Sequence, residues 1–96
     1  MTSKTRAKLR SLAAQTSSLF QIGKGGINDE LSKGVSQALD KRELVKISVL
    51  KTSPVSAKEA MELLSESLKA EPIAATGNTL VLYRKSNADG VKHIEL

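Results

Sequence analysis

The sequence predicts an α/β fold, in an α+β arrangement of two layers with helices covering a mixed four-stranded sheet. Three observations lead to this fold class. Apolar residues recur at helical spacing in three segments, whereas Val45, Ile47 and Val49 have the two-residue spacing of a strand. Gly77-Asn78 joins two short apolar runs, as in a two-residue hairpin. The resulting order is α-β-α-β-α-β-β, and right-handed β-α-β crossovers place the second and third helices on one face of the sheet.

The first element is a helix over residues 4–16. Its apolar stripe includes Leu9 and Leu12, so both side chains are expected to be buried. Because this helix lies outside the β-α-β units, we expect it beside the sheet, near the glycine-rich loop that follows.

The next segment has the pattern of a strand, a loop and a helix. Residues 19–22 are a short strand, 23–27 are the loop, and a helix capped by Asn28 runs to about Lys41. Gly34 lies inside this helix at some cost in helix propensity, which is consistent with close packing against a neighbour.

The second half of the chain supplies the rest of the sheet. Residues 43–50 are the strongest strand, and the capping box at 56–59 begins the third helix. Strands at 73–76 and 79–84 form the hairpin. The prediction is one domain over residues 1–85, followed by a flexible C-terminal tail at 86–96.

Composition excludes several classes of protein. The 96 residues contain no cysteine, so disulfides and thiol chemistry are excluded, and no apolar run approaches the ~20 residues of a membrane span. The single histidine, His93, lies in the predicted tail, and no cluster has metal-ligand spacing. We therefore expect a non-enzymatic protein of the cytoplasm with no catalytic residues, no metal, no cofactor and no membrane partner.

The positive charge is concentrated in the first half of the chain. Residues 1–51 hold ten Lys and Arg against four Asp and Glu, whereas 52–96 hold five against six. Such segregation favours a face that binds a polyanion, although an accident of composition in a small domain gives the same numbers.

The first helix carries four cations and no acid. Lys4 and Lys8 flank its apolar stripe on one side, and Arg6 and Arg10 flank it on the other. Like charges at this spacing destabilise an isolated helix, which suggests an external anion. A solvated surface helix whose basic stems cover an apolar edge explains the pattern equally well.

The sequence Gly23-Lys24-Gly25-Gly26 is a GxxG loop between a strand and a helix. Backbone N–H groups and the lysine can contact a sugar-phosphate chain there, as GxxG loops do in KH domains. A tight connection that merely needs glycine is the alternative, and the charge around the loop favours the first interpretation. Phe20 is expected in the core and Tyr83 is expected to be half-buried, so a sheet surface that stacks RNA bases is poorly supported. Binding along the RNA backbone, or binding to structured RNA, fits the sequence better.

Several motifs in order closely resemble the CRM domain of the small stand-alone bacterial YhbY-like proteins. They are Lys4-Thr5-Arg6-Ala7-Lys8-Leu9-Arg10-Ser11-Leu12-Ala13, Phe20-Gln21-Ile22-Gly23-Lys24-Gly25-Gly26, Ala38-Leu39-Asp40-Lys41-Arg42-Glu43-Leu44-Val45-Lys46 and Gly77-Asn78-Thr79-Leu80-Val81-Leu82-Tyr83-Arg84. The resemblance implies a fold similar to the C-terminal domain of bacterial translation initiation factor three. It also implies RNA binding through the GxxG loop and association with precursors of the large ribosomal subunit. The arginine-rich extensions typical of the family are absent.

The leading hypothesis is a monomeric RNA-binding module that acts in ribosome assembly on ribosomal RNA or a large-subunit precursor. Its expected RNA contacts are Gly23, Lys24, Gly25 and Gly26 in the loop, with Lys8, Arg10, Lys33, Lys41 and Arg42 around it. The first alternative is a protein-interaction adaptor whose basic face binds an acidic partner. A binder of a small phosphorylated ligand is a third possibility, which needs a deep pocket.

Overall fold

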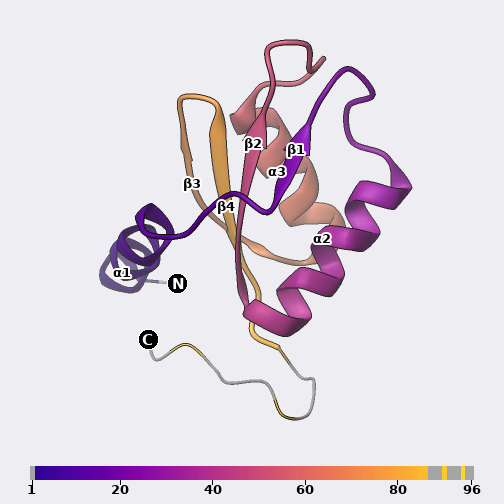
Figure 1. Ribbon diagram of the computed structural model, residues 1–96. Helices are drawn as coiled ribbons and strands as arrows, with labels where there is room; N and C mark the ends of the chain where they lie inside the picture. The colour runs from indigo at the N-terminus through magenta and orange to yellow at the C-terminus, as the bar shows by residue number, and fades with distance from the viewer. Residues whose placement is uncertain (1, 87–89, 91–93, 95–96) are drawn as a thin grey trace.

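The computed structural model describes residues 2–86, Gly90 and Ile94 (Figure 1). Its elements are α1 (Ser3–Ala14), β1 (Phe20–Ile22), α2 (Asp29–Arg42), β2 (Leu44–Val49), α3 (Ala57–Leu68), β3 (Glu71–Thr76) and β4 (Thr79–Tyr83). The predicted order and the mixed four-stranded sheet are confirmed. Among the described residues, no helix combines the length and the hydropathy that crossing a membrane requires.

The strands lie in the order β1-β2-β4-β3. β1 is parallel to β2, and β4 is antiparallel to both of its neighbours. β4 therefore lies between the two parallel strands that α3 connects. The Gly77-Asn78 turn is confirmed, because Gly77 adopts a φ of +58° and β3 and β4 pair up to Thr76 and Thr79.

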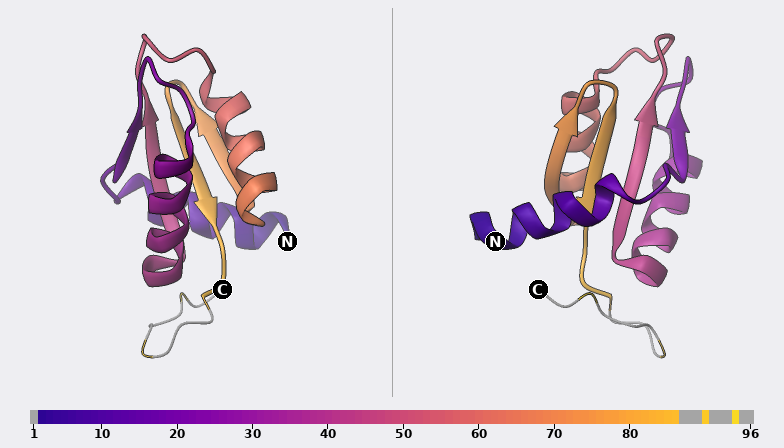
Figure 2. Two further views of the ribbon diagram at one scale, coloured as in Figure 1. Left: turned by 90° about the vertical axis from the view of Figure 1, so that its right-hand side faces the viewer. Right: turned by 60° about the vertical axis from the view of Figure 1, so that its left-hand side comes forward.

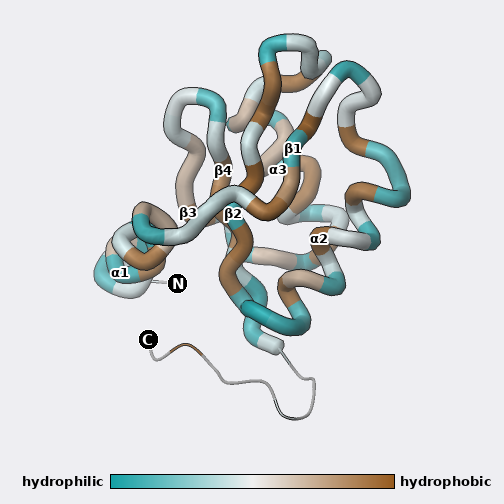
Figure 3. Tube along the Cα trace, in the orientation of Figure 1, coloured by the Kyte–Doolittle hydropathy of each residue, from teal (hydrophilic) through white to brown (hydrophobic). Residues whose placement is uncertain are grey.

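The main core lies between the sheet and the helices α2 and α3. Alternate residues of β2 and β4 point to this side, and Figure 3 shows the hydrophobic positions along these strands. The largest fully buried side chains of this core are Ile22, Val35, Leu39, Val45, Ile47, Leu64, Leu80 and Leu82.

The first helix packs against the opposite face of the sheet (Figure 2). Leu9 and Ala13, which are four residues apart on one side of α1, lie in a second buried cluster; its other members are Leu44, Ile73, Val81 and Tyr83. Placing this helix near the glycine-rich loop was wrong, because its apolar residues pack on β2, β3 and β4, whereas the loop follows the edge strand β1. The expected burial of Leu12 was also wrong, since its side chain is 38% exposed on the flank of α1.

The two predicted helix caps, Asn28 of α2 and Ser56 of α3, are both present. The Leu31 N–H donates to Asn28 Oδ1 at 2.8 Å, and the Glu59 N–H donates to Ser56 Oγ at 3.2 Å. The start of β3 differs from the prediction, because this edge strand begins at Glu71 with a register irregularity after Pro72. An edge strand tolerates a proline, which has no N–H to donate to a neighbour.

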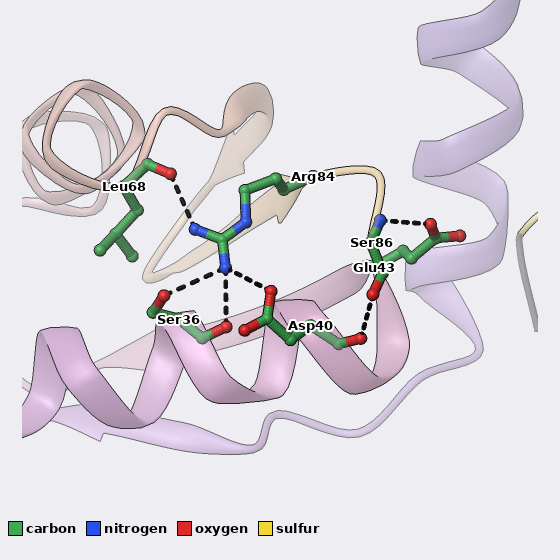
Figure 4. A network of polar contacts seen from close by, with 6 residues as sticks. All are labelled: Ser36, Asp40, Glu43, Leu68, Arg84 and Ser86. Atoms are coloured by element: carbon green, nitrogen blue, oxygen red, sulfur yellow. Dashed lines mark hydrogen bonds and ion pairs between the residues drawn. The ribbon is translucent and has the colours of Figure 1, made fainter. Parts of the chain in front are cut away.

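A polar network joins the end of β4 to α2 and α3 (Figure 4). The Arg84 guanidinium donates to the Leu68 carbonyl at 2.8 Å, to the Ser36 carbonyl and hydroxyl at 2.8 and 3.0 Å, and to Asp40 Oδ1 at 3.0 Å. One side chain thus links acceptors on α2 to the Leu68 carbonyl, which lies at the end of α3 and has no partner within that helix.

The buried Glu43 carboxylate continues this network. Glu43 is fully buried at the end of α2 with a φ of +64°, and it accepts hydrogen bonds from the N–H groups of Ser86 and Ile94 at 2.6 and 2.8 Å. The Ser86 hydroxyl donates to the Asp40 carbonyl. Only Ser86, Gly90 and Ile94 of the predicted tail are described, and His93 lies outside the described residues. The boundary at residue 85 stays a prediction, although Ser86 and Ile94 both contact the domain.

Candidate nucleic-acid interface

The GxxG loop is a closed turn between β1 and α2. The Gly26 N–H donates to the Gly23 carbonyl at 2.9 Å, so Lys24 and Gly25 form its tip. Gly26 has a φ of +65°, and a Cβ there would lie 3.0 Å from Pro54 Cγ. A Cβ on Gly25 would meet nothing within 4 Å. The fold therefore requires glycine at Gly26, whereas the bare backbone at Gly25 is open to a ligand.

A cleft of about 600 Å³ separates this loop from α2. On the helix side it is lined by Glu30, Lys33, Gly34 and Gln37, which share one stripe of α2. The remaining lining residues are Phe20, Gln21, Gly23, Gly25, Gly26, Asn28 and Leu31. The loop and the helix are thus two walls of one concave surface.

Gly34 and Phe20 meet inside this cleft. A Cβ on Gly34 would lie 3.1 Å from Phe20 Cε1, so the absence of a side chain leaves room for the ring. This contact confirms the close packing that the sequence predicted at Gly34. The expectation that Phe20 belongs to the core needs correction. Its ring packs against the main cluster but stays partly exposed, because β1 is an edge strand and nothing described covers its outer side.

Three exposed lysines surround the loop side of the molecule. Lys24 is at the loop tip, Lys33 lines the cleft, and Lys51 follows β2. Because β1 and β2 are parallel, their carboxyl ends meet at one edge, and Leu50 Cδ1 lies 3.6 Å from the position of a Cβ on Gly23. Within the described part of the chain, none of the three lysines forms an ion pair.

Sequence reasoning missed Lys51 at this site. It lies directly after the strongest predicted strand, but its distance in sequence from the loop hides the proximity. A parallel pairing of the two strands would have placed it there, since their loops emerge together.

Lys41 and Arg42 are not brought to the loop. They occupy the last turn of α2, and with a rise of about 1.5 Å per residue the 14-residue helix separates them from its first turn by about 20 Å. Cations in this position stabilise the helix by interacting with the negative end of its dipole.

Lys8 and Arg10 lie on α1, across the sheet from the cleft. Both are exposed, and Arg10 borders a smaller hollow of about 260 Å³ together with Lys46, Thr76 and Thr79. Lys46 Nζ also donates to the Ala13 carbonyl at 3.5 Å, near the end of α1. Lys46 was not among the predicted contacts, although strand alternation already placed it opposite the main core.

The two aromatic residues differ in their surroundings. Burial raises the pKa of Tyr83, and the negative charge of Glu43 raises it further. Tyr83 packs in the cluster beneath α1, so Phe20 is the aromatic side chain at the cleft. Among the described residues, no group of three or more His, Cys, Asp and Glu side chains could hold a metal ion.

Comparison with known proteins gives a consistent picture. A family model described as the CRS1/YhbY (CRM) domain matches residues 1–84. A Bacillus subtilis (strain 168) protein named "Probable RNA-binding protein YqeI" is 38% identical over 96 residues, which cover 100% of this chain and 98% of that relative. The solution structure of "the hypothetical protein SAV1595 from Staphylococcus aureus, a putative RNA binding protein" superposes with a TM-score of 0.81 at 42% identity, covering 100% and 98% of the two chains.

Proposed function

The chain belongs to the CRS1/YhbY (CRM) domain family, and we propose that it is an RNA-binding protein that holds the RNA backbone at the loop Gly23–Gly26. The observation that carries this proposal is the combination of an open glycine backbone and free cations around one cleft. Gly25 has empty space at its Cα, and Lys24, Lys33 and Lys51 are exposed beside it. A phosphate at the tip can accept from backbone N–H groups and pair with Lys24.

We further propose that the RNA is ribosomal, in a precursor of the large ribosomal subunit, and that the protein acts there as a non-catalytic monomer. The family resemblance supports this partner, and both relatives described above are named as RNA-binding proteins. Such a role would place the protein in the cytoplasm.

The remaining predicted contacts have a secondary part in this proposal. Lys41 and Arg42 lie at the far end of α2, and Lys8 and Arg10 lie across the sheet. They can reach phosphates only of an RNA large enough to extend around the domain. We therefore assign them weaker, sequence-independent contacts.

Titration of a labelled fragment of large-subunit ribosomal RNA by fluorescence anisotropy tests the backbone clamp. Lys24→Gln should weaken binding about fivefold, because it removes a charged contact but leaves a turn whose shape depends on Gly26. Lys69→Gln is the matched control, since Lys69 is also exposed and ends α3. Equal affinities of the two variants at low salt would contradict the assignment of the loop.

Sedimentation after ribonuclease treatment separates RNA binding from protein binding. The proposal expects co-sedimentation with large-subunit particles to be lost when RNA is digested. Persistence of the association would favour an adaptor that binds an acidic protein.

A further inference from the structure

We infer that the cleft between the loop and α2 takes an unpaired base, so that the protein selects single-stranded RNA over a duplex. The inference rests on the proposed function and deepens it, because it concerns the same site and names the form of the RNA. It departs from the expectation of backbone tracking or structured RNA.

The shape of the site favours an inserted group. The cleft has about 600 Å³, within the range of about 300–1,000 Å³ that is typical of pockets for small molecules. An A-form duplex offers a convex, regular backbone whose bases are paired and stacked, so it has nothing to place inside such a cleft. An unstacked base of a single strand can enter it.

The distribution of charge favours a phosphate at the loop tip and a base inside the cleft. Inside the cleft, the charge of Lys33 is balanced by that of Glu30. Lys24 is at the loop tip and is not among the lining residues. A phosphate is therefore attracted to the rim, whereas an uncharged base fits the neutral interior.

The surface of the interior suits a base. Phe20 and Leu31 supply apolar area, and the bare Gly34 keeps the middle of the cleft open beside the ring. RNA-binding proteins commonly stack unpaired bases on aromatic side chains. Phe20 is partly exposed and can serve as that platform.

The amide side chain of Gln37 can contact the edge of the base. Gln37 lines the cleft from α2, whereas Gln21 alternates along β1 with the core-facing Phe20 and Ile22, so its side chain points to the other face of the sheet. Within the described residues, the Gln37 side chain forms no hydrogen bond. An amide donates and accepts at the same time, as recognition of a base edge requires.

Nuclear magnetic resonance offers a direct test, because the chain has one Phe and one Tyr. A short single-stranded RNA and the blunt duplex of the same length are titrated into the full chain. We expect the Phe20 ring signals to shift with the single strand and not with the duplex, while the ring signals of the buried Tyr83 stay unchanged. We also expect affinity for the single strand to exceed that for the duplex by about tenfold. Equal affinities, or an unmoved Phe20 ring, would overturn the inference.

A pair of glutamine variants provides a second readout. Gln37→Leu should weaken single-strand binding about three- to tenfold, because it removes the amide but keeps the size of the side chain. Gln15→Leu, on the exposed end of α1, is the control and should leave affinity unchanged. Loss of affinity in Lys24→Gln without loss in Gln37→Leu would overturn the inference and leave the proposed function intact. Absence of binding to either RNA by the unmodified chain would overturn both.

Discussion

Both faces of the sheet carry basic side chains, but their surfaces are very different. On the α2 side, lysines surround a cleft with an open glycine backbone, the amide of Gln37 and a partly exposed aromatic ring. On the α1 side, the helix packs on the apolar part of the face, and a smaller hollow of about 260 Å³ lies between Arg10 and Lys46. Under the proposed function, positive charge can attract RNA to both faces, and the cleft with its hydrogen-bonding groups is what distinguishes the proposed binding face.

Charge segregation along the chain is not segregation in space. The basic half of the sequence includes both α1 and the GxxG loop, and the fold places them on different sides of the sheet. We therefore propose that α1 contributes mainly to stability and that the cleft binds RNA. The following experiments could break or sharpen that division.

The largest effect is expected from Leu9→Ala on the α1 face. Leu9 is fully buried against the second cluster, so its truncation should lower the free energy of unfolding by about 2–5 kcal/mol. Denaturant unfolding measures this loss. The affinity of the folded protein for single-stranded RNA should stay within about twofold, because no group of the cleft changes. A parallel collapse of affinity in a protein that is still folded would show that α1 belongs to the site.

Paired charge removals compare the two faces directly. The double variant Lys24→Gln, Lys51→Gln should lose about tenfold or more in affinity, and its log–log salt slope should be shallower by about 1.4, since each phosphate contact on a single strand contributes about 0.7. The control is Lys8→Gln, Arg10→Gln, which removes the same charge from α1. We expect it to lose less than about threefold. A reversed order of the two losses would move the site to the α1 face.

Narrowing the cleft should affect binding more than stability. Gly34→Ala places a Cβ 3.1 Å from Phe20 Cε1, so the ring must shift by a few tenths of an ångström. The gain in helix propensity, up to about 1 kcal/mol, opposes this strain, and we expect little net change in unfolding free energy. Single-strand affinity should fall about threefold, because the ring moves into the space proposed for the base. Unchanged affinity together with a displaced Phe20 ring signal would count against the cleft.

The smallest effect is expected at the polar network, whose residues are not among those that line the cleft. Asp40→Asn removes the ion pair with Arg84 but leaves the bonds of the guanidinium to Ser36 and Leu68. The Asp40 side chain is 54% exposed, so stability should fall by about 0.2–1 kcal/mol. Thermal unfolding would measure the change, and RNA affinity should be unaltered. A larger change in affinity than in stability would link the network to the site.

Local features of the fold could be predicted because their causes are local. The Asn28 cap, the Ser56–Glu59 capping box and the Gly77-Asn78 turn depend on neighbouring residues, and all three are confirmed. Their order also predicted the mixed sheet with α2 and α3 on one face.

Features that depend on distant pairings could not be predicted. The insertion of β4 between β2 and β3, and the side of the sheet that α1 covers, follow from packing between remote residues. At the candidate site, the GxxG loop and Lys33 were found from the sequence. Lys51 was overlooked, although the predicted β-α-β crossover implies the parallel pairing of β1 and β2 that brings it to the loop. The role of Arg84 as a bridge between helices has no local pattern at all.

The backbone amide signals of the unmodified chain, recorded during titration with single-stranded RNA, test the central claim most directly. If the cleft side holds the RNA backbone, the amide signals of Gly23, Gly25, Gly26 and Lys33 should shift most, in proportion to the RNA added. Shifts confined to residues of α1, with the three loop glycines unmoved, would contradict the claim.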